Sequence, residues 1–330
     1  MDILNNIARL RRNRQSPWLR DLLAETRLST SDLILPIFLV EGNNIKQEIT
    51  HLPDVFRFSI DLALEEARKA RDLGIKAVIL FSATSQNLKT DDGKEALNPN
   101  NLVCRTIAAI KTNVPEIGVI CDVALDPYTT HGHDGILDKN GYVANDETVE
   151  LLCKQAVVQA RAGADIIAPS DMMDGRVAEI RLALDTEGFE KVAIMSYAAK
   201  YASNFYGPFR HAVGSSNNLQ KADKKTYQMD FRNSKEAMRE ILQDEIEGAD
   251  MLIIKPALVY LDIIKTAATN VDLPIIAYQV SGEYAMLKFA AANGAFDFEE
   301  ALFETLTACK RAGATAIITY GAVEIAKKIA

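Results

Sequence analysis

Residues 235–256, KEAMREILQDEIEGADMLIIKP, contain one complete repeating unit of the fold. The first thirteen residues place apolar side chains at helical spacing, which predicts an amphipathic helix. Gly248 then ends this helix, because glycine accepts the left-handed conformation that a helix end requires. The run 251–254 is continuously apolar, as expected for a strand that is buried on both faces of a parallel sheet. Lys255 follows directly after this strand.

The same order of helix, glycine and short apolar strand recurs along the chain. Predicted helices at 65–73, 149–161 and 301–311 also end at a glycine and lead into a strand. With four further apolar runs, the predicted strands number eight: 33–40, 77–81, 117–123, 165–168, 192–196, 251–254, 274–278 and 316–320. Eight such units predict an α/β fold of the closed (β/α)8 TIM barrel type over residues 33–330. Residues 1–32 then form an N-terminal arm. A Rossmann fold is disfavoured, because no GxGxxG motif follows the first strand.

The composition is that of an ordinary globular protein. The 330 residues are 48% hydrophobic and 25% charged, and the formal net charge of -8 argues against nucleic acid as a partner of the barrel. The longest strongly apolar run, 33–40, is too short to cross a bilayer, so we expect a cytoplasmic protein without a membrane partner. Four scattered cysteines without a CxxC pair suggest neither a disulfide framework nor a thiolate zinc site.

Two lysines, Lys200 and Lys255, follow apolar strands at equivalent positions. A single lysine at such a place more often extends into solvent. A pair points to chemistry, because burial and a neighbouring cation both lower the pKa of a lysine towards neutrality, and a neutral amine can form a Schiff base with a ketone. Barrel enzymes place their chemistry at the carboxyl ends of the strands. On that rim we also expect Asp122, Ser170, Tyr278 with Ser281, and Tyr320.

The loop after the third strand is longer than a connection requires, which is typical of a lid or a site wall. It contains two histidines and two carboxylates that could ligate a metal: His131, His133, Asp126 and Asp134. Such clusters in polar loops more often form turn hydrogen bonds, so we do not expect a tightly bound catalytic metal here.

The loop after the fifth strand is also long. It contains Arg210 and Lys224, which could hold a substrate carboxylate or belong to a solvated basic loop. Between them, the Gly-Ser-Ser run at 214–216 is consistent with a mobile cover over the site.

Several of these segments resemble one family over nearly the whole chain, the porphobilinogen synthases, also called 5-aminolevulinate dehydratases. Besides the segment around Lys200, the matching motifs are RLRR at 9–12, YTTHGH at 128–133, YQM at 227–229, EGADM at 247–251, KP at 255–256, YQVSGEY at 278–284 and TY at 319–320. Together they are highly specific.

The resemblance implies an enzyme of tetrapyrrole (heme) biosynthesis that condenses two 5-aminolevulinate molecules into porphobilinogen with loss of two waters. Lys255 would hold one ketone as a Schiff base at the P site, and Lys200 would hold the other at the A site. Asp122 would assist proton transfer. The remaining substrate contacts implied are Ser281 and Tyr320 for the P-side carboxylate, Arg210, Lys224 and Gln228 for the A-side carboxylate, and Ser170 for the A-side substrate.

One departure from the family pattern concerns metals. Zinc-dependent members have three cysteines in the loop after the third strand, where this chain has Ala124, Asp126 and Asp134. The chain therefore resembles the aspartate-rich branch, and no catalytic zinc is expected. In that branch Mg²⁺ acts at a distant allosteric site, which Glu240, with Asp171 nearby, matches in position. Glu240 could instead pair with a basic side chain on an exposed helix.

The arm contains the basic run Arg9, Arg11, Arg12 and Arg14. Composition alone leaves open a transit peptide, an RNA-binding arm or a strap onto another subunit. The resemblance implies that the arm wraps a neighbouring barrel and helps to build a homo-octamer, while dimers or hexamers remain open.

Two rival functions also remain open. A Schiff-base lyase of the aldolase type would need only one reactive lysine. A catalytically silent barrel would bind a carboxylate ligand or serve as an assembly subunit.

Overall fold

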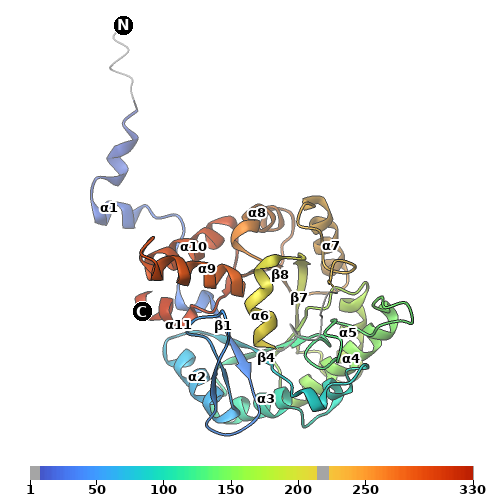
Figure 1. Ribbon diagram of the computed structural model, residues 1–330. Helices are drawn as coiled ribbons and strands as arrows, with labels where there is room; N and C mark the ends of the chain where they lie inside the picture. The colour runs from blue at the N-terminus through green and yellow to red at the C-terminus, as the bar shows by residue number, and fades with distance from the viewer. Residues whose placement is uncertain (1–7, 214–222, 330) are drawn as a thin grey trace.

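The computed structural model describes residues 8–213 and 223–329. Its centre is a closed barrel of parallel strands surrounded by helices (Figure 1). Each strand pairs with the next one of the barrel, and β10 pairs with β1 to close the ring. The eight strands are β1 (Leu33–Leu39), β4 (Ala77–Ser82), β5 (Gly118–Val123), β6 (Ile166–Pro169), β7 (Ala193–Lys200), β8 (Met251–Lys255), β9 (Ile275–Tyr278) and β10 (Ala316–Ile318). The predicted (β/α)8 barrel is confirmed.

Helices follow the strands and cover the outside of the barrel (Figure 1). Between them and the strands lies the larger of two apolar clusters, and the smaller one fills the barrel interior. The helices that surround the barrel are α2 (Ile60–Asp72), α3 (Leu102–Asn113), α4 (Asn145–Ala162), α5 (Arg176–Thr186), α7 (Ser234–Ile246), α8 (Leu261–Asn270), α9 (Ser281–Ala292), α10 (Phe298–Ala312) and α11 (Ala322–Ile329). A short helix, α6 (Gly207–Ala212), lies in the loop after β7.

The four glycines that end the predicted helices adopt left-handed conformations. Their φ angles are 84° at Gly74, 107° at Gly163, 98° at Gly248 and 121° at Gly313. Only glycine adopts these angles readily, so these positions fix where each helix stops and the chain turns back towards the barrel.

Two features of the sheet differ from the prediction. Strand β7 runs to Lys200 rather than ending at 196, so Lys200 and Lys255 are the last residues of their strands instead of following them. In addition, the short strands β2 (Lys46–Glu48) and β3 (Phe56–Phe58) form an antiparallel pair that extends the sheet beside β1. Strand β2 is exposed and β3 is only half-buried, and three residues each are too few to show a clear apolar pattern in the sequence.

The described part of the arm projects from the barrel (Figure 1). It contains a 3-10 turn at Leu10–Arg14 and the short helix α1 (Pro17–Leu22), neither of which has a buried residue. Large apolar side chains are exposed here, with Leu10 77% and Trp18 66% accessible. Within the described residues, no helix is long and apolar enough to cross a membrane.

Candidate active site

One pocket at the carboxyl ends of the strands brings together most of the predicted site residues. It is lined by Asp122, Asp126, Ser170, Lys200, Tyr206, Phe209, Arg210, Lys224, Gln228 and Lys255. These residues come from β5, β7 and β8, from the long loops that follow β5 and β7, and, for Ser170, from the position directly after β6. The free space is about 30 Å³, which corresponds to roughly one water molecule. This space is too small for a substrate, so part of the pocket wall must move when one binds.

Lys200 and Lys255 are direct neighbours across two strands. Their Cα atoms are register partners between β7 and β8, and adjacent strands lie about 4.8 Å apart. Both ammonium nitrogens lie over the ring of Tyr197, at 5.8 Å for Lys200 and 5.1 Å for Lys255. The two amines thus share one pocket.

Lys255 lies in an aromatic cage formed by four rings. Its Nζ atom is 4.3 to 5.2 Å from the ring centroids of Tyr278, Phe209, Tyr197 and Tyr206. The cage leaves the lysine only 5% exposed. Burial, and then the nearby charge of Lys200, lowers the pKa of Lys255 to about 7. Near neutral pH a large fraction of Lys255 is therefore an uncharged amine.

Lys200 has polar partners instead. Its Nζ atom donates a hydrogen bond to the carbonyl of Ser170 and lies 3.6 Å from Asp134 Oδ2. Among the ion pairs of the described residues, none involves Lys255, so the two amines differ in their surroundings although they are adjacent.

The two loop aspartates hold a third lysine. Lys224 Nζ is 2.8 Å from Asp134 and 3.2 Å from Asp126, and the whole cluster is buried. Burial alone would lower the pKa of Lys224, but the two carboxylates raise it. Burial alone would also raise the pKa of Asp134, but Lys200 and Lys224 hold it well below its usual range. The aspartates thus serve as counter-ions for the cationic side of the pocket.

Asp122, at the end of β5, is suited to proton transfer. Burial raises its pKa to about 7, although the charge of Lys200 opposes the rise. A group whose pKa lies near the working pH can both accept and donate a proton. Asp122 and Lys255 therefore have similar pKa values within one pocket.

Ser281 and Tyr320 lie behind the pocket wall rather than on it. The hydroxyl of Ser281 accepts a hydrogen bond from the backbone N–H of Phe209 at 2.9 Å. The hydroxyl of Tyr320 is 3.2 Å from that of Tyr278, whose ring belongs to the cage. Both hydroxyls therefore contact residues of the cage and do not line the lysine pocket.

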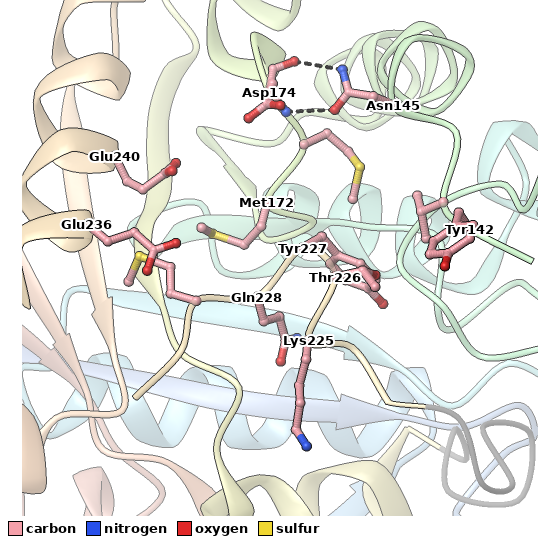
Figure 2. Close-up of a pocket in the computed structure, with 13 residues that line it drawn as sticks. Tyr142, Asn145, Met172, Asp174, Lys225, Thr226, Tyr227, Gln228, Glu236 and Glu240 are labelled. Carbon is pink, nitrogen blue, oxygen red and sulfur yellow. Dashed lines mark hydrogen bonds between the residues drawn. The ribbon is translucent and has the colours of Figure 1, made fainter. Parts of the chain in front are cut away.

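Glu240 lines a different cavity of about 350 Å³ (Figure 2). Glu240 and Glu236 project into it from α7, while Asp174 and Asn145 form two mutual hydrogen bonds at another edge. Gln228 lines both this cavity and the lysine pocket. The two cavities therefore share Gln228 as part of their walls.

Asp171 is not among the residues that line this second cavity. It is fully buried, its carboxylate accepts a hydrogen bond from the backbone of Met173, and it lies 3.8 Å from Arg176 Nε. No group of three or more His, Cys, Asp or Glu side chains suited to a metal ion occurs within residues 8–213 and 223–329. Glu240 and its neighbours supply the oxygen ligands that Mg²⁺ prefers, and such an ion usually keeps several waters.

Sequence reasoning missed the aromatic cage. Tyr206 and Phe209 belong to the loop after β7. The sequence shows that they are aromatic, but no periodic pattern predicts that a ring in this loop contacts a lysine at the end of a strand. The histidines of the other long loop make hydrogen bonds, His133 with the Tyr227 hydroxyl and His131 with the Asp91 carbonyl. The cover predicted from residues 214–216 lies outside the described residues.

Comparison with known proteins gives a consistent result. A sequence profile described as delta-aminolevulinic acid dehydratase matches residues 7–328. The delta-aminolevulinic acid dehydratase of Bradyrhizobium diazoefficiens is 53% identical over 97% of this chain and 90% of that protein. The enzyme of the same name from Chlamydia pneumoniae is 51% identical over 98% of this chain and 96% of that protein. A crystal structure of delta-aminolevulinic acid dehydratase (porphobilinogen synthase) from Toxoplasma gondii, in complex with the reaction product porphobilinogen, superposes with a TM-score of 0.95 at 47% identity, covering 98% of this chain and 91% of that one.

Proposed function

Because this chain belongs to the delta-aminolevulinic acid dehydratase family, we propose that it joins two 5-aminolevulinate molecules into porphobilinogen through Schiff bases on Lys255 and Lys200. The observation that carries the proposal is the pairing of these lysines on adjacent strands within one buried pocket. Two ketones tethered side by side lose little further freedom when they react, which is a large contribution to rate. A single-lysine aldolase or a silent barrel would have no use for the second buried amine.

The first Schiff base forms at Lys255. Its neutral amine attacks the ketone carbon of one substrate, and dehydration of the adduct releases one water. Asp122 can provide the proton that the leaving hydroxyl needs and later accept one, since its pKa is about 7. The aromatic cage excludes competing water from the iminium.

The second substrate binds at Lys200. An iminium withdraws electrons from the neighbouring carbon, so a proton can leave and the resulting enamine can attack the other bound molecule. One carbon–carbon bond and one carbon–nitrogen bond then close the pyrrole ring, while the bonds to Lys255 and Lys200 break and return both lysines as free amines. The two waters lost overall are those released when the two Schiff bases form. Lys200 must exchange the Ser170 carbonyl and Asp134 for the substrate ketone before it reacts.

The carboxylates of the substrates have separate partners. Arg210, Lys224 and Gln228 line the A side, and Lys224 would turn from its aspartates towards the substrate carboxylate. Ser281 and Tyr320 would bind the P-side carboxylate once Phe209 moves and frees the Ser281 hydroxyl. Opening at α6 therefore both admits the substrate and uncovers its carboxylate site.

Magnesium and assembly are further parts of the proposal. Glu240 would contact an allosteric Mg²⁺ mainly through water, and Asp171 would act only indirectly, because it already lies against Arg176. We also propose a homo-octamer in the cytoplasm, in which the arm packs its exposed Leu10 and Trp18 on another subunit. No part of the proposed reaction is assigned to zinc.

The proposal is tested by the colorimetric assay for porphobilinogen on purified protein, combined with borohydride reduction in the presence of 5-aminolevulinate. We expect product formation and adducts on both Lys255 and Lys200. The Lys255→Ala variant should make no product, while the exposed Lys265→Ala variant should behave like the native chain. Product formation by Lys255→Ala would refute the mechanism. A single adduct with other ketones would instead indicate an aldolase.

A further inference from the structure

Between two pairs of register partners, strand β7 contains one residue more than its neighbour β8. Ser196 pairs with Leu252 and Ala199 pairs with Ile254, so two residues of β7 lie opposite one residue of β8. This is a β-bulge, which bends a strand and changes where its later side chains point. The bulge lies just before Lys200, the last residue of the strand.

The bulge determines the direction of Lys200. In a regular strand, side chains alternate between the two faces, so residues three apart point to opposite faces. Tyr197 belongs to the cluster inside the barrel, and Ala198 and Ala199 both belong to the cluster outside it. Two successive outward residues restore Lys200 to the inner face, where it lines the pocket. Without the bulge, Lys200 and Tyr197 would lie on opposite faces.

Arg176 contacts the bulge from outside the barrel. It is the first residue of α5 and only 2% exposed. Its Nη2 atom donates to the backbone carbonyl of Tyr197 at 3.1 Å and to the hydroxyl of Ser196 at 3.1 Å. The guanidinium of Arg176 therefore binds the carbonyl of Tyr197, which is in the bulge, and the hydroxyl of Ser196, which precedes the bulge.

Asp244, on α7, fixes the orientation of this guanidinium. Its two carboxylate oxygens accept from Nη1 at 3.2 Å and from Nη2 at 3.1 Å. The Ser196 hydroxyl also donates to Asp244 at 2.6 Å. Such a two-pronged contact is specific to arginine, because its donors are held in a rigid plane.

We propose that Arg176, oriented by Asp244, is a positioning residue that holds the bulge of β7 and thereby turns Lys200 into the pocket. The inference rests on the proposed function, in which Lys200 forms the second Schiff base. Lys255 needs no such support, because β8 alternates regularly, with Ile253 inside the barrel and Ile254 outside it. The effect of Arg176 should therefore be selective for one of the two lysines.

The test compares adduct formation at the two lysines in Arg176→Lys. This variant keeps a positive charge beside Asp244, but an ammonium cannot maintain the two-pronged contact and also reach the Tyr197 carbonyl. After reduction with borohydride in the presence of 5-aminolevulinate, peptide mass spectrometry gives the adduct at each lysine. We expect the Lys200 adduct to fall at least tenfold relative to the Lys255 adduct, which stays within twofold of the native value.

Arg181→Lys is the matched control. Arg181 lies on the same helix and also donates to backbone carbonyls, of Val192 at 2.7 Å and of Phe189 at 3.1 Å, but before the start of β7. Both adducts should form normally in this variant. The milder Ser196→Ala variant leaves the ion pair intact and should lower the Lys200 adduct by two- to threefold, which keeps the test available if Arg176→Lys folds poorly.

The outcomes separate this inference from the proposed function. An unchanged ratio of the two adducts in Arg176→Lys and Ser196→Ala would overturn the positioning role. A parallel fall of both adducts would also overturn it, since Arg176 would then be only structural. Absence of both adducts in the native chain would refute the proposed function itself, and this inference with it.

Discussion

Lys255 lies in an apolar half of the pocket, and Lys200 lies in a charged half. Four aromatic rings surround Lys255, and its pKa falls to about 7. Lys200 instead contacts Asp134 and the Ser170 carbonyl, beside an ion-paired Lys224. The comparison indicates how one enzyme can treat two identical substrates differently: the apolar half provides a free amine, and the polar half provides charges that orient the second molecule.

The largest expected effect comes from removing the amine of the polar half. Lys200→Ala should lower porphobilinogen formation by on the order of 10⁴-fold, because the second substrate can no longer be tethered. The variant should still form the borohydride adduct on Lys255, since the aromatic cage is untouched. Peptide mapping with the colorimetric assay checks both. Loss of the Lys255 adduct in this variant would show that Lys255 does not form its Schiff base independently of Lys200.

The second prediction concerns stability. A pKa that falls from 10.5 to about 7 means that the folded state resists protonation of Lys255, at a cost of about 4–5 kcal/mol where the amine is charged in both states. The unfolded chain binds the extra proton, so this cost is fully present below pH 7 and shrinks as the pH rises towards 10.5.

Lys255→Met should therefore be inactive and yet raise Tm at pH 6, with a smaller gain at pH 9. Lys200→Met should lower stability by about 3 kcal/mol, because Asp134 loses one of its two buried cationic partners. Calorimetry of both variants across this pH range checks the contrast. A lower Tm for Lys255→Met at pH 6 would contradict the inference that the buried, charged amine of Lys255 destabilises the fold.

The third prediction concerns a substitution that opens the aromatic cage. Phe209→Ala should admit water to Lys255, raise its pKa and shift the acid limb of the pH–rate profile upwards by about one unit. Activity at pH 6 should then fall about tenfold, with little change at pH 9. Phe303→Ala, which removes a ring from the outer cluster, is the control and should leave the profile in place. An unshifted pH–rate profile in Phe209→Ala would show that the aromatic cage does not lower the pKa of Lys255.

The smallest expected effect concerns magnesium. Glu240 shares its cavity with Gln228, which also lines the lysine pocket, so Mg²⁺ should act mainly on the A side. Glu240→Gln should reduce the activation by Mg²⁺ about fivefold, in the usual range of coupling between sites. The exposed Glu304→Gln is the control. Activation that is equal in both variants, or strong inhibition by zinc-specific chelators, would contradict the metal assignment.

Much of the fold could be predicted from local signals. Gly163 and Gly248 marked helix ends, and continuous apolar runs marked strands buried on both faces. The true end of β7 could not be predicted, because Ala198 and Ala199 have poor strand propensity and are held in the strand by neighbouring elements. The bulge likewise depends on Arg176 and Asp244, which are 68 residues apart.

Part of the candidate site could also be predicted from the sequence, because the position of the strand ends follows from the fold. Strand ends converge in a parallel barrel, so Asp122, Lys200 and Lys255 could be placed on one rim from the sequence. The aromatic cage could not, because its rings come from β7, β9, α6 and the turn before α6. Nor could the pairing of Lys224 with Asp126 and Asp134, since it joins two loops about 90 residues apart without a shared pattern.

Lys255 is a free amine in the apolar half of the pocket, whereas Lys200 is ion-paired in the polar half. The most direct test is rapid-quench borohydride trapping of the native chain with 5-aminolevulinate at pH 7, with the adduct at each lysine followed over time. We expect Lys255 to be labelled first and Lys200 later. Labelling of Lys200 first, or of both lysines at equal rates, would contradict it.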